Sequence, residues 1–406
     1  MEKNRSNPGS TRLFIAMLIL PWMSVGGQAI MSVAPDMAIA LGVSDNTIKL
    51  VSTIMNITMV PSCIIGGIIA GKKVGYKALL LWSGLVLVVS GTLPFFLNDF
   101  NMILVTRLVF GVASGFMMPL GPALIFKLFD GDMRTRVLGL NTTSMFVSAV
   151  IYTLIGGNLA EISWRFAFLP QLLGIIPMVV LFFLLPSVPK TVPVKLEGAP
   201  AVPLFTRMKG AFPLKTLWFI LFAFVLQMFM FPIMVNTPFI IAENGLGSAA
   251  TSSLVLSANT IAGALSSFSF AFVAKKLKRY ALPISLTSCA VGFGLIYLAT
   301  GLPMMFFGTI LNGAGAAMMN MAMLIEVGTF IPSESISIYT GANMAAGSIG
   351  GFCLTGYMSV LAKLGFVTAQ SSMLISGIGT GVLMLIILVY IVTGNRRRAK
   401  IAAQEL

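Results

Sequence analysis

The sequence contains no histidine, and it has only three cysteines among its 406 residues. Without histidine the chain lacks the commonest general base, proton relay and metal ligand that operate near neutral pH. Cys63, Cys289 and Cys353 lie inside apolar segments and have neither metal-ligand spacing nor the pattern of a disulfide framework. A nucleotide-binding loop of the GxxxxGK(S/T) type is also missing, which argues against direct use of ATP. We therefore expect no metal, no cofactor and no enzymatic activity.

Charged residues are scarce as well. They make up 9% of the chain, whereas hydrophobic residues make up 57%. A soluble domain carries about 25% charged residues, so this chain has too little polar surface to cover a water-soluble globule. A mean hydropathy of +0.97 agrees with this interpretation. The composition predicts a protein embedded in a membrane.

Apolar runs of about twenty residues, the length that crosses the hydrocarbon core of a bilayer, fall into two sets of six. The first set covers residues 12–35, 47–70, 78–97, 100–120, 136–160 and 166–186. The second set covers residues 215–240, 250–274, 281–299, 302–326, 337–361 and 372–394. We predict an all-α membrane protein of two six-helix bundles.

The formal net charge of +14 is distributed along the chain in a regular way. Basic residues gather in alternate loops, from Lys3 and Arg5 at the start to the run 396–400 near the end. Basic loops are typical of the cytoplasmic side of a membrane. We therefore expect both termini in the cytoplasm of a bacterial cell, with the chain as a multi-pass protein of the inner membrane. Nucleic acid is not expected as a partner.

Residues 187–214 form the longest polar stretch and contain five prolines, so they are interpreted as a cytoplasmic linker. The predicted domains are residues 1–186, this linker and residues 215–406. A shift of 203 positions places Pro35 on Pro238 and Asn56 on Asn259. Such matches in corresponding spans favour an internal repeat, the arrangement of carriers whose halves rock about a site at the midplane.

Three segments carry a family resemblance. Residues 67–77 read GIIAGKKVGYK, Arg107 is followed by Gly111 and Gly115, and Gly156-Gly157 precedes Trp164-Arg165. These segments resemble the loop signature GxLaDrxGrk, the arginine motif of the fourth span and the end of the fifth span in the major facilitator superfamily. The resemblance covers the whole chain, and it implies a twelve-helix secondary carrier of the bacterial drug or metabolite type.

The chain departs from these motifs at three places. Gly71 stands where the loop signature has Asp, and Tyr76 stands where it has Arg. Tyr152-Thr153 replaces the Gly-Pro pair that drug and metabolite exporters of the superfamily usually have before their paired glycines. The direction of transport is therefore left open between export and uptake. The loop residues expected to act in conformational change are Gly67, Lys72, Lys73, Gly75 and Lys77.

Polar side chains within predicted spans are candidates for binding a solute, because such groups are costly in a membrane and usually functional. Arg107 is the basic residue that lies clearly inside a span, and its alternative role is to tie helices together through backbone carbonyls or Gln28. The other candidates are Gln28, Asn56 and Tyr152 in the first half and Gln227, Asn236, Asn259 and Asn312 in the second. Aromatic and methionine residues of the seventh span suit either an adaptable pocket or simple packing.

Glu326 and Asp36 are the candidates for coupling to a proton, with ordinary interfacial charges as the alternative. We expect a monomeric secondary transporter that moves a small organic solute, anionic or amphipathic, across the plasma membrane by alternating access. A proton or another counter-ion is a candidate second partner. The alternative function is a proton-coupled multidrug efflux antiporter.

Overall fold

A computed structural model describes residues 8–23, 26–71, 74–186, 214–277, 280–328, 336–366 and 368–404. Within these residues the chain is helical, and β-structure is limited to an isolated bridge between Ala70 and Val74. The predicted all-α fold is therefore confirmed. The predicted linker 187–214 lies outside the described residues, except for its last residue, Leu214.

The chain divides into two compact units. Unit 1 comprises Met1–Pro200 and Gly247–Ser257, and unit 2 comprises Ala201–Leu246 and Ala258–Leu406. The α-helices of unit 1 are α1 (Pro8–Ile19), α2 (Ala34–Leu41), α3 (Asp45–Ile48), α4 (Leu50–Thr53), α5 (Met55–Ile69), α6 (Tyr76–Thr92), α7 (Phe100–Met117), α8 (Leu120–Leu128), α9 (Gly131–Ala160) and α10 (Ile175–Leu184). Its 3₁₀ segments are η1 (Leu20–Met23), η2 (Gly26–Val33), η3 (Leu93–Phe96) and η4 (Trp164–Gly174).

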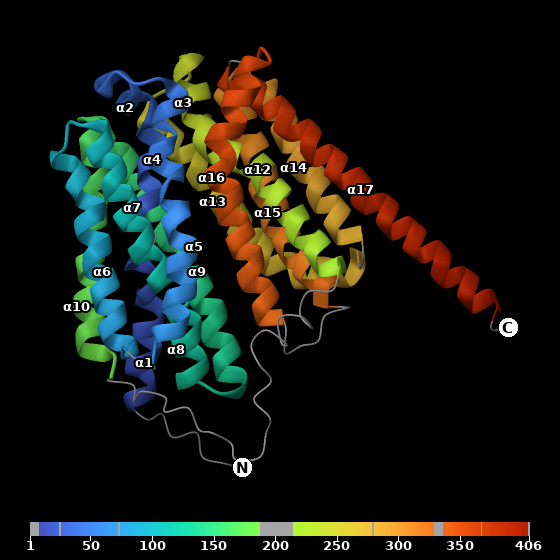
Figure 1. Cartoon of the computed structure of the whole chain (residues 1–406), viewed down its shortest axis with the longest axis horizontal. Helices are drawn as coiled ribbons and strands as arrows, with labels where there is room; N and C mark the ends of the chain where they lie inside the picture. The colour runs from blue at the N-terminus through green and yellow to red at the C-terminus, as the bar shows by residue number, and fades with distance from the viewer. Residues whose placement is uncertain are drawn as a thin grey trace. The chain divides into compact units, whose positions relative to one another are not determined.

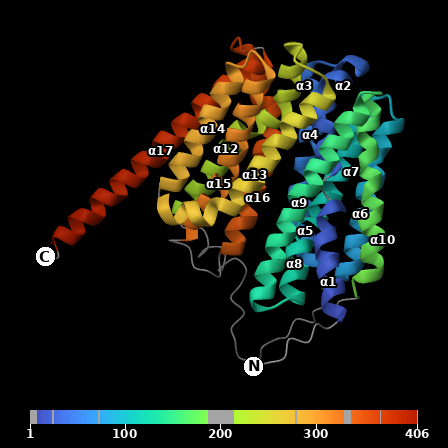
Figure 2. The same cartoon turned by 180° about the vertical axis from the view of Figure 1, so that it is seen from behind.

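Unit 2 contains α12 (Leu214–Glu243), α14 (Ala281–Tyr297), α15 (Leu302–Gly328), α16 (Ile336–Lys363) and α17 (Ala369–Gln404). Helix α13 (Ala249–Leu277) is shared, because its first turns belong to unit 1 and the remainder belongs to unit 2. Within unit 1, α1, α6 and α10 run side by side (Figures 1 and 2). Within unit 2, α14 packs along both α15 and α17.

Ten described helical stretches are long and apolar enough to cross a membrane. The predicted spans 12–35 and 281–299 correspond to shorter apolar helices. The first is divided between Thr11–Met23 and Ile30–Leu41, and the second is the 17-residue helix α14. Gly26 and Gly27 lie at the start of the 3₁₀ segment η2, and glycine is a weak helix former. Helix α2 follows η2 directly and ends at Leu41, beyond the predicted end of the span at residue 35.

Each unit has an apolar core of its own. In unit 1 the fully buried side chains include Met17, Met23, Leu80 and Leu87. In unit 2 a buried cluster joins α12 to α16 through Val235, Leu354 and Met358.

Gly111 and Gly115 allow α7 to pack closely against α5, as their spacing predicts. A Cβ atom on Gly111 would lie 2.2 Å from the Met55 carbonyl oxygen, and one on Gly115 would lie 2.3 Å from the Met59 carbonyl oxygen. A related contact occurs in unit 2, where a Cβ on Gly313 of α15 would lie 2.2 Å from the Asn259 carbonyl oxygen of α13. The two contacts fall at nearly equivalent positions of the proposed repeat.

Candidate functional site

Arg107 occupies the interior of unit 1. The Asp99 carboxylate begins helix α7 by accepting a hydrogen bond of 2.8 Å from the Met102 backbone N–H, which places Arg107 two turns into the helix. The Arg107 side chain is only 1% exposed. Its Nη2 donates to the carbonyl oxygens of Ser90 at 3.1 Å and Gly91 at 3.3 Å, near the end of α6. The guanidinium is therefore held by backbone acceptors of a neighbouring helix.

Two aromatic rings complete the surroundings of this cation. The guanidinium carbon of Arg107 lies 5.0 Å from the centroid of Phe110 and 5.4 Å from the centroid of Phe168 in η4. Aromatic faces attract a cation, and the attraction strengthens where water is excluded. These contacts join α6, α7 and η4. The geometry therefore matches the alternative role of Arg107, which is to hold neighbouring helices together. A role of Arg107 in binding a solute stays a prediction.

A buried amide lies beside this cation. Gln171 in η4 is 3% exposed, and a Cβ on Gly91 would lie 2.3 Å from its Cγ atom. Neither the nitrogen nor the oxygen of the Gln171 amide has a hydrogen-bond partner among the described residues, and the same holds for Arg107 Nε. Buried polar groups usually find partners, so this cluster has hydrogen-bonding capacity left for a water molecule or another polar ligand.

The other predicted residues of the first half lie on three different elements, η2, α5 and α9. The Tyr152 hydroxyl donates to the Trp22 carbonyl oxygen at 2.8 Å, and the two rings meet edge to face. Asn56 is buried in α5, and its Nδ2 has no partner among the described residues. Gln28 lies in η2, and its side chain is outside the described part of the chain. Tyr152 thus joins α9 to η1.

The predicted polar residues of the second half mainly connect helices of unit 2. Asn236 Nδ2 donates to the Ser372 hydroxyl at 2.6 Å, linking α12 to α17. Asn259 Nδ2 donates to the Thr309 carbonyl oxygen at 2.8 Å, linking α13 to α15. Asn312 is buried in α15, and its Nδ2 has no partner among the described residues.

Gln227 and Glu326 differ from these residues in burial, because both are only half-buried. Gln227 packs against Gly347 and Gly350 of α16, and Gly351 approaches the ring of Phe231. Gly347 and Gly351 therefore allow α16 to lie close to α12. Glu326 lies near the end of α15.

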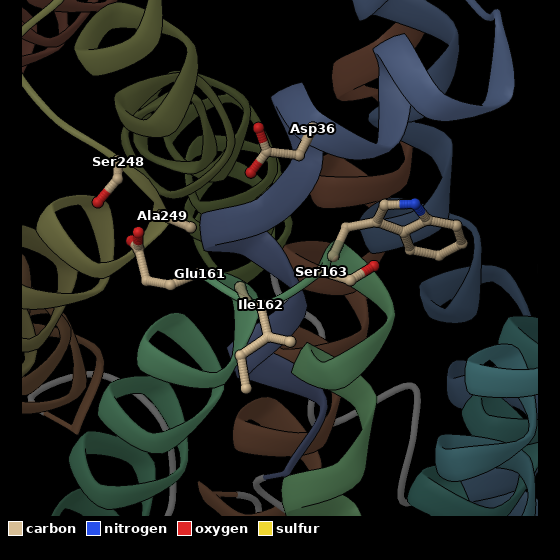
Figure 3. A pocket seen from close by; sticks show the side chains of 8 residues that line it. Asp36, Glu161, Ile162, Ser163, Ser248 and Ala249 are labelled. Atoms are coloured by element: carbon tan, nitrogen blue, oxygen red, sulfur yellow. The ribbon is translucent and has the colours of Figure 1, made fainter.

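A pocket of about 370 Å³ lies in unit 1 between α2, the turn that joins α9 to η4, and the start of α13. Its lining includes two carboxylates, Asp36 and Glu161, together with the hydroxyl groups of Ser163 and Ser248. Figure 3 shows Asp36 and Glu161 on different segments around this space. The pocket thus combines acidic groups with the N-terminal end of a helix.

Glu161 caps the start of α13. Its Oε1 accepts a hydrogen bond of 3.0 Å from the Ala250 backbone N–H. Hydrogen bonds from the Ser248 side chain and the Ala250 backbone lower the pKa of Glu161 below its usual value. A carboxylate at this position also complements the positive end of the helix dipole. Nearby, a Cβ on Gly157 would lie 2.3 Å from the Ser253 side chain, so this glycine allows α9 to approach the same turn of α13.

Asp36 lies just beyond the predicted first span. Partial burial is the larger cause that raises the pKa of Asp36, and the negative charge of Glu161 adds to it. The two carboxylates are therefore electrostatically coupled. A role of Asp36 in proton coupling stays a prediction.

The loop between α5 and α6 contains Gly71, which has a φ of +72°, a backbone conformation that favours glycine. A Cβ on Gly71 would lie 2.2 Å from the Tyr76 ring, so the two positions that depart from the loop signature contact each other. Lys127 Nζ lies 5.1 Å from the centroid of the same ring. A Cβ atom added to Gly67 or Gly75 would meet no atom within 4 Å. Lys72 and Lys73 are outside the described residues.

The model of one protein family matches residues 14–248, which is more than half of the chain. That family is the Major Facilitator Superfamily. The chain belongs to the Major Facilitator Superfamily. The ten described helical stretches of membrane-spanning length agree with this membership.

Curated relatives of this superfamily member are transporters. The uncharacterized MFS-type transporter YhcA of Bacillus subtilis (strain 168) is 27% identical over 207 residues, which are 50% of this chain and 38% of the relative. The multidrug efflux pump SdrM of Staphylococcus aureus (strain N315) is 28% identical over 158 residues, which are 38% of this chain and 34% of that protein. The chain thus spans little more than a third of the length of these relatives.

Solved structures confirm the superfamily fold along nearly the whole chain. A nucleoside transporter, NupG, has a TM-score of 0.78 at 14% identity and covers 93% of this chain and 99% of its own. A bacterial homologue of the human lysosomal transporter Spinster has a TM-score of 0.75 at 14% identity, with coverage of 94% and 96%. At such identities the likeness concerns the fold alone.

Two site residues of this superfamily member, Gln171 and Glu161, were not among the residues predicted from the sequence. Gln171 is an amide within an otherwise apolar run, and that position is a signal that could have identified it. Glu161 accepts a hydrogen bond from Ala250, which lies 89 positions further along the sequence. No local sequence pattern predicts the contact between Glu161 and Ala250.

Proposed function

We propose that this protein is a secondary transporter that moves a small amphipathic organic solute across the bacterial plasma membrane by alternating access. Membership of a carrier superfamily supports the transport step, and the lack of a nucleotide-binding loop agrees with secondary transport. The direction that we favour is export, because one relative is a multidrug efflux pump.

The observation that carries the proposal is the position of α13, which begins in unit 1 and continues in unit 2. Glu161 and Gly157 hold its first turns. We propose that this contact forms a gate that opens and closes during each transport cycle. A hydrogen-bonded cap suits such a gate, because water can replace the hydrogen bonds of the cap at a cost of only about 1 kcal/mol each.

An amphipathic solute is preferred to a small anion because of the contacts of Arg107. Its charge is already surrounded by two carbonyl oxygens and two aromatic rings, and its side chain is 1% exposed. An anionic solute would have to compete for a cation that already ties helices together. The half-buried aromatic and methionine side chains of α12 instead suit an adaptable apolar surface.

The test is thermal stabilisation of the purified protein by a panel of organic anions, zwitterions and lipophilic cations. A ligand that binds only the folded state raises the apparent stability by RT ln(1 + [L]/Kd). We expect lipophilic compounds to stabilise the wild type and Arg107→Lys to a similar extent. Stabilisation by anions that is lost in both Arg107→Gln and Arg107→Lys would contradict this assignment and identify Arg107 as an anion anchor.

A proton-coupled multidrug antiporter is the second candidate, and the coupled carboxylates Asp36 and Glu161 are the observation that favours it. Under this hypothesis Asp36 binds and releases a proton in each cycle. Transport by Asp36→Asn should then lose its dependence on an imposed pH gradient while downhill exchange of the solute continues. An unchanged response to the gradient would remove Asp36 from this role.

A further inference from the structure

An apolar groove of about 370 Å³ lies on the surface of unit 1 between α6 and α10. Its lining contains no charged residue and consists of Leu81, Trp82, Leu85, Met178, Val179, Phe182 and Phe183. Several of these side chains are strongly exposed, with Trp82 at 66% and Phe183 at 76%. Both helices belong to candidate membrane spans, so this surface faces lipid rather than water.

One end of the groove differs from the rest of its lining, because a lysine lies there. Lys77, Leu81 and Leu85 are spaced four residues apart on α6, so they share one stripe of the helix surface. Lys77 is half-buried, and its Nζ lies 5.2 Å from the centroid of the Phe182 ring at the end of α10. The ammonium group is thus held where the apolar lining ends.

The positive charge at this end is not isolated. The neighbouring residue Tyr76 lies beneath the ammonium group of Lys127, with Nζ 5.1 Å from the ring centroid. Lys127 belongs to the last turn of α8. Two cations from different helices therefore lie over aromatic rings, Lys77 over Phe182 and Lys127 over Tyr76. This end of the unit is also the one predicted to face the cytoplasm.

The dimensions of the groove match one leaflet of a bilayer. From Lys77 to Leu85 the helix rises by about 12 Å, at about 1.5 Å per residue. Half of the hydrocarbon core is about 15 Å thick. A lysine at the interface with an apolar groove extending toward the membrane centre complements a molecule with an anionic head and a hydrocarbon tail.

We propose that this groove is a binding site for an anionic phospholipid, whose acyl chain lies against Trp82 and Phe182 and whose phosphate pairs with Lys77. Ordinary boundary lipid would cover the same surface without regard to headgroup charge. A dedicated site differs by a preference for the anionic lipid that depends on Lys77. The site is separate from the solute pathway and does not depend on the proposed direction of transport.

The test uses Trp82 as a local reporter. The full-length protein is reconstituted in phosphatidylcholine that contains a small fraction of brominated phosphatidylglycerol or of brominated phosphatidylcholine, and tryptophan quenching is measured. The contribution of Trp82 is the difference between the wild type and Trp82→Phe, which keeps an aromatic ring in the groove. We expect the brominated anionic lipid to occupy the site about fivefold more strongly than the brominated zwitterionic lipid.

Lys77→Gln should abolish this preference, and Lys77→Arg should retain it. Lys363→Gln is the matched control, because it removes one positive charge from the end of α16 in unit 2. Equal quenching of the wild type by both lipids would show ordinary boundary lipid and overturn the proposal. A preference that survives in Lys77→Gln would equally overturn it, provided that the variant keeps the wild-type melting temperature.

Discussion

Replacement of Gly111 by alanine tests the close packing of α5 and α7. The added Cβ would lie 2.2 Å from the Met55 carbonyl oxygen and 2.3 Å from Thr58 Oγ1. An ordinary contact begins at 3.4 Å, so relieving the clash requires a displacement of about 1 Å, which one side chain cannot provide because a backbone oxygen is involved. The same displacement would weaken the hydrogen bond of 2.8 Å from the Thr58 hydroxyl to the Leu108 carbonyl oxygen.

The expected cost of Gly111→Ala follows from these contacts. Overpacking of a tight interface costs about 1–3 kcal/mol, and the hydrogen bond contributes about 1 kcal/mol more. Better helix propensity returns up to about 1 kcal/mol. We therefore expect a net loss of about 1–3 kcal/mol, which lowers the melting temperature by several degrees.

Thermal unfolding of the detergent-solubilised protein, followed by tryptophan fluorescence, measures this effect. Gly139→Ala is the matched control, because Gly139 also lies in a helix of unit 1 and a Cβ there would meet no atom within 4 Å. The control should melt at or slightly above the wild-type temperature. Equal melting temperatures for Gly111→Ala and Gly139→Ala would refute the reasoning about close helix contact.

Further predictions concern the carboxylate pocket and a buried tyrosine. Because hydrogen bonds lower the folded-state pKa of Glu161, its carboxylate stabilises the fold above pH 4.5 and loses this effect as the pH falls. Glu161→Gln should therefore lower the melting temperature at pH 7 and have little effect in acid. Since the side chain is exposed and screened by solvent, the loss in the free energy of unfolding should be no more than about 1 kcal/mol. The folded-state pKa of Asp36 is raised, so its ionisation costs stability, and Asp36→Asn should raise the melting temperature at pH 7; an equal effect below pH 3.8 would contradict this cause. Tyr152→Phe removes the hydrogen bond to the Trp22 carbonyl oxygen and should cost about 1 kcal/mol in thermal unfolding, whereas no change would mean that this bond contributes nothing.

The sequence predicted the fold because hydrophobic runs of membrane length report directly on helices in a bilayer. It also predicted the close contacts of Gly111 and Gly115, since small residues four positions apart lie on one face of a helix. The first span was less accurate. Its described part includes the 3₁₀ segments η1 and η2 and ends with α2 at Leu41, and hydropathy alone does not distinguish a 3₁₀ segment from an α-helix.

The candidate site was harder to predict than the fold. Sequence position gave Arg107 its depth in α7, but it could not show whether the side chain points toward a cavity or toward the carbonyl oxygens of Ser90 and Gly91. Asn236 and Asn259 were recognised as intramembrane amides, whereas their partners Ser372 and Thr309 depend on helix packing. Pairings between distant segments are set by tertiary structure, and local sequence patterns do not encode them.

The gate at the start of α13 is the part of the proposed transport cycle that can be tested most directly. Glu161→Cys and Ala250→Cys, introduced together after Cys63, Cys289 and Cys353 are replaced by serine, can be joined by a short bifunctional thiol reagent. Transport is then measured in proteoliposomes without nucleotide, with the compound that stabilises the protein most in the ligand panel. We predict that flux stops after cross-linking, while each single-cysteine protein treated in the same way remains active. Undiminished flux in the cross-linked protein would contradict alternating access through this gate, and flux that requires ATP would contradict secondary transport.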